Sequence, residues 1–341
     1  MNRKFGILGC EHGHIAIFIE EMLAIGHECV GLYEPGNEKL AASIAGKYRI
    51  PVLDDSARLL EPDVEIIGSS SINNEKIDVI ELCESHGKHI MVDKPAVTNR
   101  SGLERLQAVV RRGNVQVGML LTERFHPAIH TLKKLIERGE LGRLVTIGMR
   151  KPHRLGAANR PSWFFSREQS GGILVDLLVH DFDLLRWLTG AEIAETNGYM
   201  GKHILPEHPE FYDEVSLQVR MTKGVGAQLY ADWHTPGRSW TWGDGRIFAT
   251  GTEGFAELRL SGDPLVGLEP IVVSASFEKE TARIAALAPE WSISEDFLRR
   301  IDGRPSIIGH SDIVAASLAC VMADEQVRIV RAEPGGGNNE Q

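Results

Sequence analysis

Short apolar segments alternate with helical segments over residues 5–121, and this alternation limits the possible fold more than any other feature of the chain. The apolar segments have the length of strands, and glycines and polar residues separate them from stretches with helical periodicity. Strands that alternate with helices in this way form a mainly parallel sheet covered by helices. The predicted strands span residues 5–8, 28–33, 64–68, 88–92 and 115–121, and the predicted helices span residues 15–23, 74–86 and 100–112.

The turn after the first predicted strand is where a doubly wound sheet binds a dinucleotide. Gly9 ends this strand, and Glu34 ends the next, close to the spacing of about 20 residues at which an acid binds the adenine ribose. A carboxylate repels a 2′-phosphate, and no arginine or lysine follows directly, so the sequence favours NAD over NADP. The glycine fingerprint is incomplete, because Glu11 and His14 stand where glycines are usual.

Several side chains of this turn have chemistry of their own. His12 or His14 can donate to phosphate, and Gly13 can restore part of the backbone freedom that Glu11 removes. Together with Cys10, these histidines and Glu11 are also metal-ligand types. Four such residues in one tight turn cannot all converge on a single ion, so we expect no metal here.

The carboxyl ends of parallel strands meet at one edge of a sheet, and ligands lie beyond that edge. Gly9, Glu34, residues 69–73 and the turn of Asp93, Lys94 and Pro95 all lie at such ends. Pro95 restricts the backbone of the residue before it, and a cis bond there would aim Lys94 in a single direction. A loop lysine is usually a solvated charge, but its place on the predicted cofactor edge favours a functional role for Lys94.

After residue 121 the alternation stops, and predicted strands follow one another without helices between them. This pattern indicates an α+β domain with a mainly antiparallel sheet. The chain is therefore predicted to contain an N-terminal Rossmann domain with a doubly wound parallel sheet at 1–121, an α+β domain at 122–332 and a disordered tail at 333–341. The second domain's predicted strands span 144–151, 193–204, 215–221, 227–233, 246–250 and 255–260, and its helices include 127–138, 290–300 and 310–325.

One further helix is predicted within residues 171–190, between two glycines and a closing glycine. It is apolar nearly all round, so it should be mostly buried. Asp176, His180, Asp183 and Trp187 nevertheless recur at helical spacing and share one stripe. Two explanations stay open from the helix alone: a hydrogen-bonded polar pair in the core, or a proton-transferring histidine with an acid beside it.

The composition excludes several classes of partner. The net charge is −10 with no basic block, which argues against nucleic acid and against an anionic membrane surface. The four cysteines are scattered without a C-x-x-C pair, a pattern typical of reduced intracellular proteins. No signal peptide and no membrane-spanning apolar run are evident, so we expect a cytoplasmic protein.

Two motifs give a more specific indication. Residues 87–95 resemble the G-K-H-V-x-x-E-K-P motif of the glucose-fructose oxidoreductase, inositol dehydrogenase and rhizopine-catabolism (Gfo/Idh/MocA) family, with Asp93 in place of the usual Glu. The two glycines followed by Asp176, His180 and Asp183 resemble its G-G-G-x-x-x-D-x-x-x-H-x-x-D motif. The likeness covers nearly all of residues 3–330 and includes Trp163 and the segments 139–142 and 251–254.

The resemblance implies an NAD(P)-dependent oxidoreductase that transfers a hydride between nicotinamide and a hydroxyl-bearing carbon of a sugar, cyclitol or related polyol. It implies that Lys94 orients nicotinamide and the substrate hydroxyl, that His180 is the general base, and that Asp176 binds a substrate hydroxyl and steers the histidine. It also implies a homodimer or homotetramer built through one face of the second sheet. The predicted cofactor-binding residues are Gly9, Glu11, His12, Gly13, His14, Glu34, Ser71, Asn73, Lys94 and Pro95.

Substrate contacts are expected from polar and aromatic residues near the loops of the second half. Our substrate set contains Arg124, His153, Trp163 and Asp176, and the wider group of candidates adds His126, Arg154, His234 and Trp240.

The chain departs from the family pattern where members usually have T-P-N-x-x-H. Asn73 matches, but Ile72 replaces the proline and Lys76 replaces the histidine, which suggests an altered cofactor site. Two other functions therefore stay open: an NAD-using glycosidase or lyase with no net redox change, and a non-catalytic regulator that binds dinucleotide or sugar.

Overall fold

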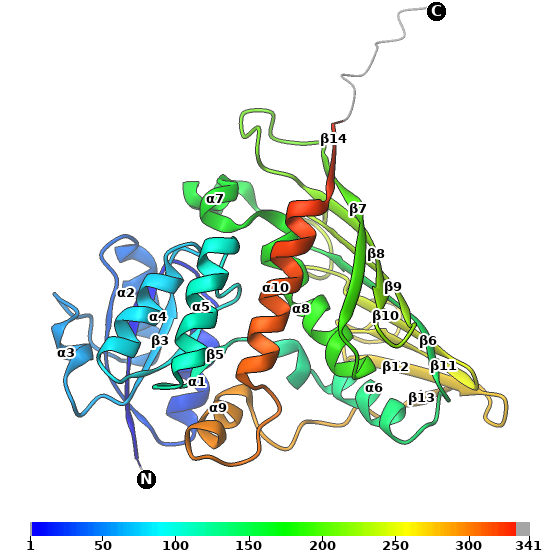
Figure 1. The fold of residues 1–341 in the computed structure, drawn as a ribbon, viewed down its shortest axis with the longest axis horizontal. Coiled ribbons are helices and arrows are strands. Elements are labelled where there is room, and N and C mark those ends of the chain that lie inside the picture. Colours follow the sequence, from blue (N-terminus) through cyan, green and yellow to red (C-terminus); the bar gives the residue numbers. More distant parts are fainter. Residues whose placement is uncertain (1, 332–341) are drawn as a thin grey trace, which may run out of the picture. The chain divides into compact units, whose positions relative to one another are not determined.

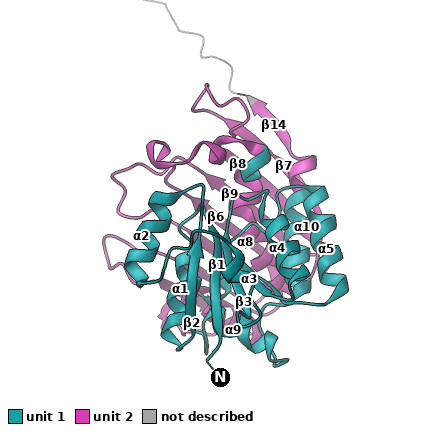
Figure 2. Cartoon of the chain, turned by 90° about the vertical axis from the view of Figure 1, so that its left-hand side faces the viewer, with its two compact units in different colours: residues 1–125, 168–171, 289–321 teal, residues 126–167, 172–288, 322–341 magenta. Residues whose placement is uncertain are grey.

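The computed structural model describes residues 2–331, which form two compact units coloured separately in Figure 2. The predicted tail at 333–341 lies outside the described residues. Within residues 2–331, no helix combines the length and the apolar character needed to cross a membrane. Unit 1 comprises Met1–Phe125, Glu168–Gly171 and Pro289–Val321, and unit 2 comprises His126–Arg167, Gly172–Ala288 and Met322–Gln341.

The first unit ends near the predicted boundary at 121, but it also takes in two segments that the sequence analysis assigned to the second domain. One of them carries helix α9 (Ile293–Ile301), which packs on α1 (Ile15–Ala24). The Arg300 guanidinium donates to the Val117 carbonyl at 2.6 Å. These contacts join distant parts of the chain, so no local sequence pattern reports them.

Unit 1 contains the predicted parallel sheet, in the order β2-β1-β3-β4-β5. Val52 pairs in parallel with Leu32 as an isolated bridge beside β2. If this bridge is counted as a short outer strand, the order becomes the 3-2-1-4-5-6 order of a doubly wound dinucleotide-binding fold. The strands are β1 (Lys4–Cys10), β2 (Glu28–Tyr33), β3 (Ile66–Ser70), β4 (His89–Val92) and β5 (Val117–Met119).

Helices cover this sheet because each presents an apolar stripe to it. Helix α1 buries Ile15, Phe18, Ile19 and Met22, which recur at helical spacing, and it packs on β2 and β3. Helix α4 (Lys76–Ser85) packs on β3, β4 and α5 (Arg100–Arg112). The sequence analysis did not predict α2 (Glu38–Tyr48), although Asn37 caps it by accepting from the Leu40 amide, nor the short α3 (Ala57–Leu60).

Two histidines of unit 1 accept backbone hydrogen bonds next to β5. The Val117 amide donates to His310 Nε2 at 3.0 Å, and the Gln116 amide donates to His89 Nδ1 at 2.9 Å. Each accepting nitrogen must be unprotonated. Burial and the nearby Arg300 charge lower the pKa of His310 to about 4, and burial also lowers the pKa of His89.

We therefore predict that acid weakens this unit before its carboxylates protonate. The unfolded histidine binds a proton below about pH 6.5 and the folded one only near pH 4, so stability is complete above pH 6.5 and falls as the pH drops between these values. His310→Gln keeps an acceptor that does not titrate, so it should reduce this loss by roughly 1–3 kcal/mol. Urea unfolding at pH 7.0 and 4.5 measures the difference, with the exposed His86→Gln as control; equal losses in H310Q and wild type would contradict the prediction.

Unit 2 is built on a mixed, mostly antiparallel sheet (Figure 1), which confirms the predicted α+β class. Its order is β13-β12-β11-β10-β6-β9-β8-β7-β14, with parallel pairs only at β6–β9 and β7–β14 among the described strands. The strands are β6 (Leu144–Pro152), β7 (Ile193–Lys202), β8 (Glu214–Met221), β9 (Gly226–Asp232), β10 (Arg246–Gly251), β11 (Gly254–Arg259), β12 (Ile271–Ser276), β13 (Ala282–Ile284) and β14 (Arg328–Arg331).

The sequence analysis missed β12, β13 and β14. They lie at or next to the two edges of the sheet, and β13 carries no buried residue. Such strands are defined by their partners rather than by a two-residue apolar period, so their sequences carry little signal.

Helix α8 (Gly172–Thr189) packs on β6, β8 and β9, and α6 (Pro127–Glu137) packs on β11 and β12. The two glycines at the start of α8 have a positive φ, 83° at Gly171 and 70° at Gly172, which explains why this start needs glycine. The helix is buried along most of its length, as predicted. The remaining helices are α7 (Arg167–Ser170), α10 (His310–Gln326) and the short turns Thr122–Phe125, Ala157–Asn159 and Ser162–Phe165.

Candidate active site

The first part of the site is the edge of the unit 1 sheet where β1 and β3 end. Gly9 has a φ of 86°, and a Cβ there would lie 1.9 Å from the Ser71 Oγ. Only glycine therefore allows the β1 turn to approach the end of β3. This close approach is what the first glycine of a dinucleotide-binding turn provides.

Glu34 is fixed by backbone amides at the end of β2. Its Oε2 accepts from the Cys10 amide at 2.6 Å, and its Oε1 accepts from the amides of Gly36 at 2.6 Å and Asn37 at 3.2 Å. The residue is only 8% exposed. The carboxylate thus joins the end of β2 to the β1 turn, a role that the sequence analysis did not anticipate alongside its predicted contact with ribose.

Four acidic residues line the pocket at this edge of the sheet. The pocket has a volume of about 370 Å³ and includes Glu11, Glu34, Glu75 and Asp78. Burial and the neighbouring charges of Asp78, Glu11 and Glu34 raise the pKa of Glu75. An anionic group added to this pocket would meet further repulsion.

Glu11 does not direct its carboxylate along the turn. A Cβ at Gly36 would lie 2.5 Å from Glu11 Oε1 and 3.1 Å from Glu34 Oε1, so both carboxylates lie beside the Gly36 backbone. Glu11 thus adds its charge to that of Glu34 at the end of β2.

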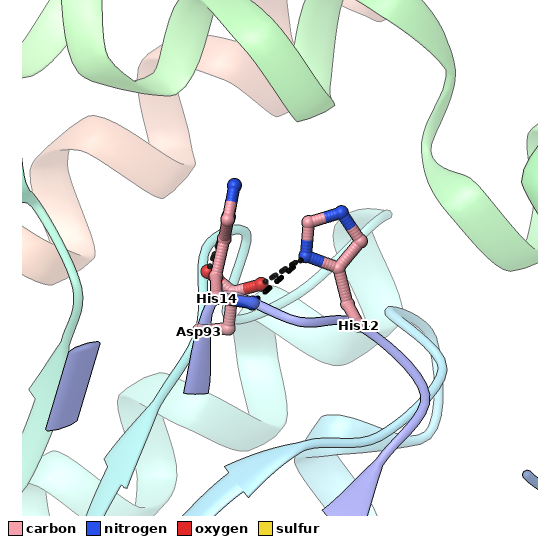
Figure 3. Close-up of side chains that lie close together, drawn as sticks. All are labelled: His12, His14 and Asp93. Atoms are coloured by element: carbon pink, nitrogen blue, oxygen red, sulfur yellow. Dashed lines mark hydrogen bonds and ion pairs between the residues drawn. The ribbon is translucent and has the colours of Figure 1, made fainter. Parts of the chain in front are cut away.

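His12 and His14 converge on one buried carboxylate, as Figure 3 shows. His12 Nδ1 lies 3.3 Å from Asp93 Oδ2, and His14 Nδ1 lies 3.3 Å from Asp93 Oδ1. The two rings are 4.1 Å apart at an angle of 81°. Each oxygen of Asp93 therefore faces a different imidazole.

The charge state of this cluster follows from its burial. Burial by itself raises the pKa of Asp93, but the charges of His14 and Lys76 and the hydrogen bonds from both histidines hold it well below its usual range. Burial lowers the pKa of His12 to about 4 although Asp93 opposes the shift. At neutral pH the carboxylate is thus ionised and orients His12 as a neutral imidazole.

These three side chains are also of metal-ligand types, and one ligand atom from each lies within 4.8 Å of the others. From the sequence, only residues of the β1 turn were considered as metal ligands. One of them, Cys10, is buried in the sheet, and this burial raises the pKa of its thiol to about 12. The third member, Asp93, comes from another strand, which spacing within the turn could not reveal.

Lys94 lies two residues after the end of β4 and is 6% exposed, and the Lys94–Pro95 peptide bond is cis. A second lysine supports this turn: Lys76 is fully buried and donates to the carbonyls of Lys94 at 3.2 Å and Pro95 at 3.3 Å. Lys76 also donates to Asn73 Oδ1 at 2.8 Å, and Asn73 Nδ2 donates to the Ser170 carbonyl at 2.8 Å. The lysine that replaces the histidine of the family motif thus supports the turn that carries Lys94, together with the matching Asn73.

Unit 2 holds the second group of predicted residues on α8. Asp176 is partly exposed, whereas His180 is 9% and Asp183 1% exposed. The neighbouring Asp181 forms a buried ion pair with Lys151 of β6 at 2.8 Å. This pair fixes α8 to the sheet on which it packs.

The structure gives the predicted substrate residues different surroundings. His153 contacts the Trp233 ring at 5.7 Å, and Trp163 is buried against Phe164. Arg124 belongs to unit 1, is 1% exposed and donates to the Ile307 carbonyl and to Asp312, both at 2.9 Å. A buried guanidinium held in this way stabilises the fold, so we exclude Arg124 from the substrate residues proposed below.

The residues of the wider substrate group also differ in their surroundings. His126 caps α6 by accepting from the Ala128 amide, and His234 pairs with Asp213 at 2.9 Å. Trp240 is 37% exposed. The sequence analysis did not include Arg160 among the candidate site residues. Arg160 lies in unit 2, and the charge of Asp176 opposes the lowering of its pKa by burial. A lone arginine in a loop carries no sequence signal for such a contact.

The doubly wound sheet, its glycine turn and the acid ending β2 define an NAD-binding Rossmann protein of the oxidoreductase class. The chain belongs to the GFO/IDH/MocA family: the model described as "Oxidoreductase family, NAD-binding Rossmann fold" matches residues 3–120, and the GFO/IDH/MocA C-terminal domain matches residues 129–257. This confirms the family to which the motifs pointed.

Curated relatives include the uncharacterized oxidoreductase YrbE of Bacillus subtilis, 26% identical over 74% of this chain and 72% of YrbE. The myo-inositol 2-dehydrogenase of Thermotoga maritima is 28% identical over 46% of this chain. The chain spans about half the length of several relatives, 52% of the Paenarthrobacter nicotinovorans D-xylose dehydrogenase and 44% of the Thermotoga enzyme.

Solved structures share the fold. A protein from Erwinia carotovora atroseptica SCRI1043 superposes with a TM-score of 0.88 at 24% identity, covering 96% of this chain and all of that chain. Levoglucosan dehydrogenase in complex with NADH gives a TM-score of 0.77 at 19% identity, covering 97% of this chain and 100% of that chain.

Proposed function

We propose that this protein is an NAD-dependent dehydrogenase acting on a hydroxyl-bearing carbon of a sugar, cyclitol or related polyol. The observation that carries the proposal is the pair of Asp176 and His180 one turn apart on the mostly apolar, buried helix α8, in a chain that also carries the buried Lys94. Relatives named inositol and xylose dehydrogenases support the substrate class. Catalytic roles for Lys94, Asp176 and His180 belong to this proposal.

The residues of unit 1 fit NAD. Glu34 borders the pocket at the end of β2, where the ribose hydroxyls of an adenosine would find a carboxylate acceptor. Gly9 leaves room for close backbone approach, and Ser71 faces Gly9 across the turn. We assign Gly9, Glu11, Gly13, Glu34, Ser71, Asn73 and Pro95 to cofactor binding, together with His12, His14 and Lys94.

In the proposed mechanism, NAD held by these residues of unit 1 would supply the acceptor for a hydride from the carbinol carbon. His180 accepts the hydroxyl proton as general base and returns it in the reverse direction. Lys94 donates a hydrogen bond to the same oxygen, favouring loss of the proton, and Asp176 binds a neighbouring hydroxyl and steers His180. The alcohol thus becomes a carbonyl, with one hydride leaving to the cofactor and one proton to the histidine.

A direct test is NAD binding by calorimetry followed by a polyol panel monitored by NADH absorbance. The proposal predicts net NADH formation with at least one polyol. Product formation without net NADH would instead support the NAD-using glycosidase or lyase, and NAD binding without any turnover would support the regulator.

Discrimination against NADP is expected to depend on the acidic pocket. Glu34→Gln removes the charge that would repel a 2′-phosphate, and its single amide oxygen can still accept from the amide of Cys10 or from that of Gly36, but not from both. We predict that the NAD to NADP preference in kcat/KM falls about tenfold, since like-charge contacts cost a few kcal/mol at most. Glu11→Gln is the matched comparison on the other side of Gly36; an unchanged ratio in both variants would argue against the role of these carboxylates.

We also propose a homodimer or homotetramer formed through the open face of the unit 2 sheet. Strand pairing puts Tyr199, Phe248 and Phe255 on one face, and they are 43%, 47% and 41% exposed. Exposed aromatic side chains on one broad face are typical of an interface. Phe248→Glu is predicted to reduce the mass measured by light scattering to that of a monomer, whereas Phe277→Glu, at an exposed position outside the strands, should leave it unchanged; a wild-type monomer would contradict this proposal.

A further inference from the structure

Two arginines of unit 2 differ from most arginines of the chain. Arg58, Arg105 and Arg220 form ion pairs with carboxylates on the surface. Among residues 2–331, Arg154 and Arg160 form no such ion pair, and their hydrogen bonds go only to backbone carbonyls. Burying a guanidinium group without a carboxylate partner costs free energy unless another anion binds to it.

Aromatic rings hold the Arg160 guanidinium. Its Cζ lies 4.2 Å from the centroid of Phe164, 5.5 Å from Trp233 and 5.8 Å from Trp242. Its Nε donates to the Leu155 carbonyl at 3.0 Å, and the two terminal nitrogens have no hydrogen-bond acceptor among the described residues. Stacking on rings fixes the plane of a guanidinium and leaves its edge free to donate to a planar anion.

Arg154 shares one of these rings. Its Cζ lies 5.6 Å from the centroid of Trp242, and Nη2 donates to the carbonyls of Ser239 at 3.0 Å and Thr241 at 3.4 Å. Its Nε is buried without a hydrogen-bond partner in the described chain. The two guanidinium groups therefore both lie against Trp242, which is 49% exposed.

The backbone keeps this arrangement in place. The Arg154 amide donates to the Trp242 carbonyl at 2.8 Å, so the segment after β6 is joined to the loop that carries Trp242. A Cβ at Gly243 would lie 2.1 Å from the Pro152 carbonyl oxygen, so this loop can approach β6 only with glycine there. The cluster is thus built on ordered backbone rather than on freely moving side chains.

The local charge balance is positive, although the chain as a whole carries −10. Asp176 is the carboxylate that opposes the effect of burial on the pKa of Arg160, which burial lowers. Other carboxylates of the surrounding loops have partners of their own: Asp213 pairs with His234, and Asp244 pairs with Arg246. Of the two guanidinium groups, Arg160 is therefore the one on which the charge of Asp176 acts.

We propose that Arg160, assisted by Arg154, forms a subsite for an anionic group of the substrate, a carboxylate or a phosphate, so that the preferred substrate is an acidic polyol derivative rather than a neutral one. This inference rests on the proposed dehydrogenase function. The guanidinium edge of Arg160 holds the anionic oxygens, while Asp176 binds a hydroxyl of the same molecule. Arginine suits this task because its planar donors match the oxygens of a carboxylate or phosphate in a bidentate contact.

The main alternative is that Arg160 only balances the charge of Asp176. In that case its removal would impair neutral and acidic substrates alike, because the disturbed group would be the hydroxyl-binding Asp176. A true anion subsite affects only compounds that carry the anion. The two roles therefore separate on substrate selectivity rather than on overall activity.

The test uses the full-length protein and sugars matched in stereochemistry: D-glucose, D-glucuronate and D-glucose 6-phosphate, with the galactose and galacturonate pair as a second set. Binding is measured by calorimetry without cofactor, and kcat/KM is measured with NAD. The variants are Arg160→Met, Arg160→Lys and Arg154→Met. Arg238→Met, at an exposed position of the loop that carries Trp242, removes the same charge as a control.

We expect wild type and Arg238→Met to prefer one of the acidic sugars over its neutral counterpart. Arg160→Met should lower binding and kcat/KM for that acid about 10- to 100-fold, the usual worth of a hydrogen bond to a charged group, and should abolish the preference for the acid over the neutral sugar. Arg160→Lys should recover only part of this loss because it lacks the planar pair of donors. A carboxylate preference and a phosphate preference identify the two sources of the anion.

Equal losses on neutral and acidic sugars would overturn the subsite, as would wild-type preference for the neutral sugars or an equal effect of Arg238→Met. Turnover of neutral polyols without any acid preference would leave the dehydrogenase standing and refute the subsite. Acid binding that depends on Arg160, without turnover of any compound, would support the subsite and refute the dehydrogenase.

Discussion

Replacing His180 with alanine is expected to lower kcat for polyol oxidation by about two to four orders of magnitude, the usual contribution of a positioned general base. NAD affinity should stay near the wild-type value, because His180 belongs to unit 2 whereas the proposed adenosine pocket is formed by unit 1 residues. Stopped-flow or steady-state measurement of NADH formation gives kcat, and calorimetry gives the affinity for NAD.

A second variant separates catalysis from folding, since His180 is 9% exposed and alanine leaves a void in α8. His180→Gln fills most of the volume but accepts no proton near neutral pH. It should fold like wild type, lose a similar factor in kcat and lose the ionisation of the base from the pH dependence of kcat. Near-normal turnover in both variants would refute the assignment of His180.

The largest effect on stability is expected at the buried pair of Lys151 and Asp181. Their side chains are 8% and 2% exposed and lie 2.8 Å apart, where they join β6 to α8. Lys151→Met leaves the carboxylate buried without this partner, so unfolding should become easier by about 3–5 kcal/mol. Urea unfolding followed by circular dichroism measures the change.

A double variant distinguishes loss of the pair from loss of packing. Replacing both residues, Lys151→Met with Asp181→Leu, removes the unpaired charge and should recover most of the stability, because apolar groups of similar volume often replace buried ion pairs without loss. The surface pair provides a matched control: Arg58→Met, which breaks contacts to Asp63, should cost no more than about 1 kcal/mol. A cost for Lys151→Met as small as this control would contradict the predicted role of the pair.

The fold of unit 1 could be predicted because its strands and helices are each marked by a local sequence pattern. Each strand of unit 1 is a short apolar run, and α1 repeats Ile15, Phe18, Ile19 and Met22 at helical spacing. The same holds for α8, whose bounding glycines and apolar sequence predicted a buried helix with Asp176 and His180 on one stripe. The edge strands of unit 2 were missed because their conformation comes from pairing with neighbours rather than from their own sequences.

The sequence alone did not predict contacts between residues that lie far apart in the chain. In the sequence, Lys76 was recognised only as a departure from the family motif. In the structure it is fully buried and donates to the carbonyls of Lys94 and Pro95. The sequence analysis placed Arg124 among the substrate residues. In the structure Arg124 is buried and donates to Asp312, which belongs to the segment Pro289–Val321 of unit 1. A charged side chain on its own does not reveal whether water, a ligand or a distant partner surrounds it.

The sequence by itself determined the class of fold, through the alternation of strands and helices, and the family, through two short motifs. It also predicted the edge of the sheet at which a dinucleotide binds. Only the tertiary structure decided which side chains share an environment. It joined His12 and His14 to Asp93, anchored Glu34 on three amides and gathered Arg154 and Arg160 around Trp242. Burial and charge balance arise from residues far apart in the chain, and they exist only once the chain has folded.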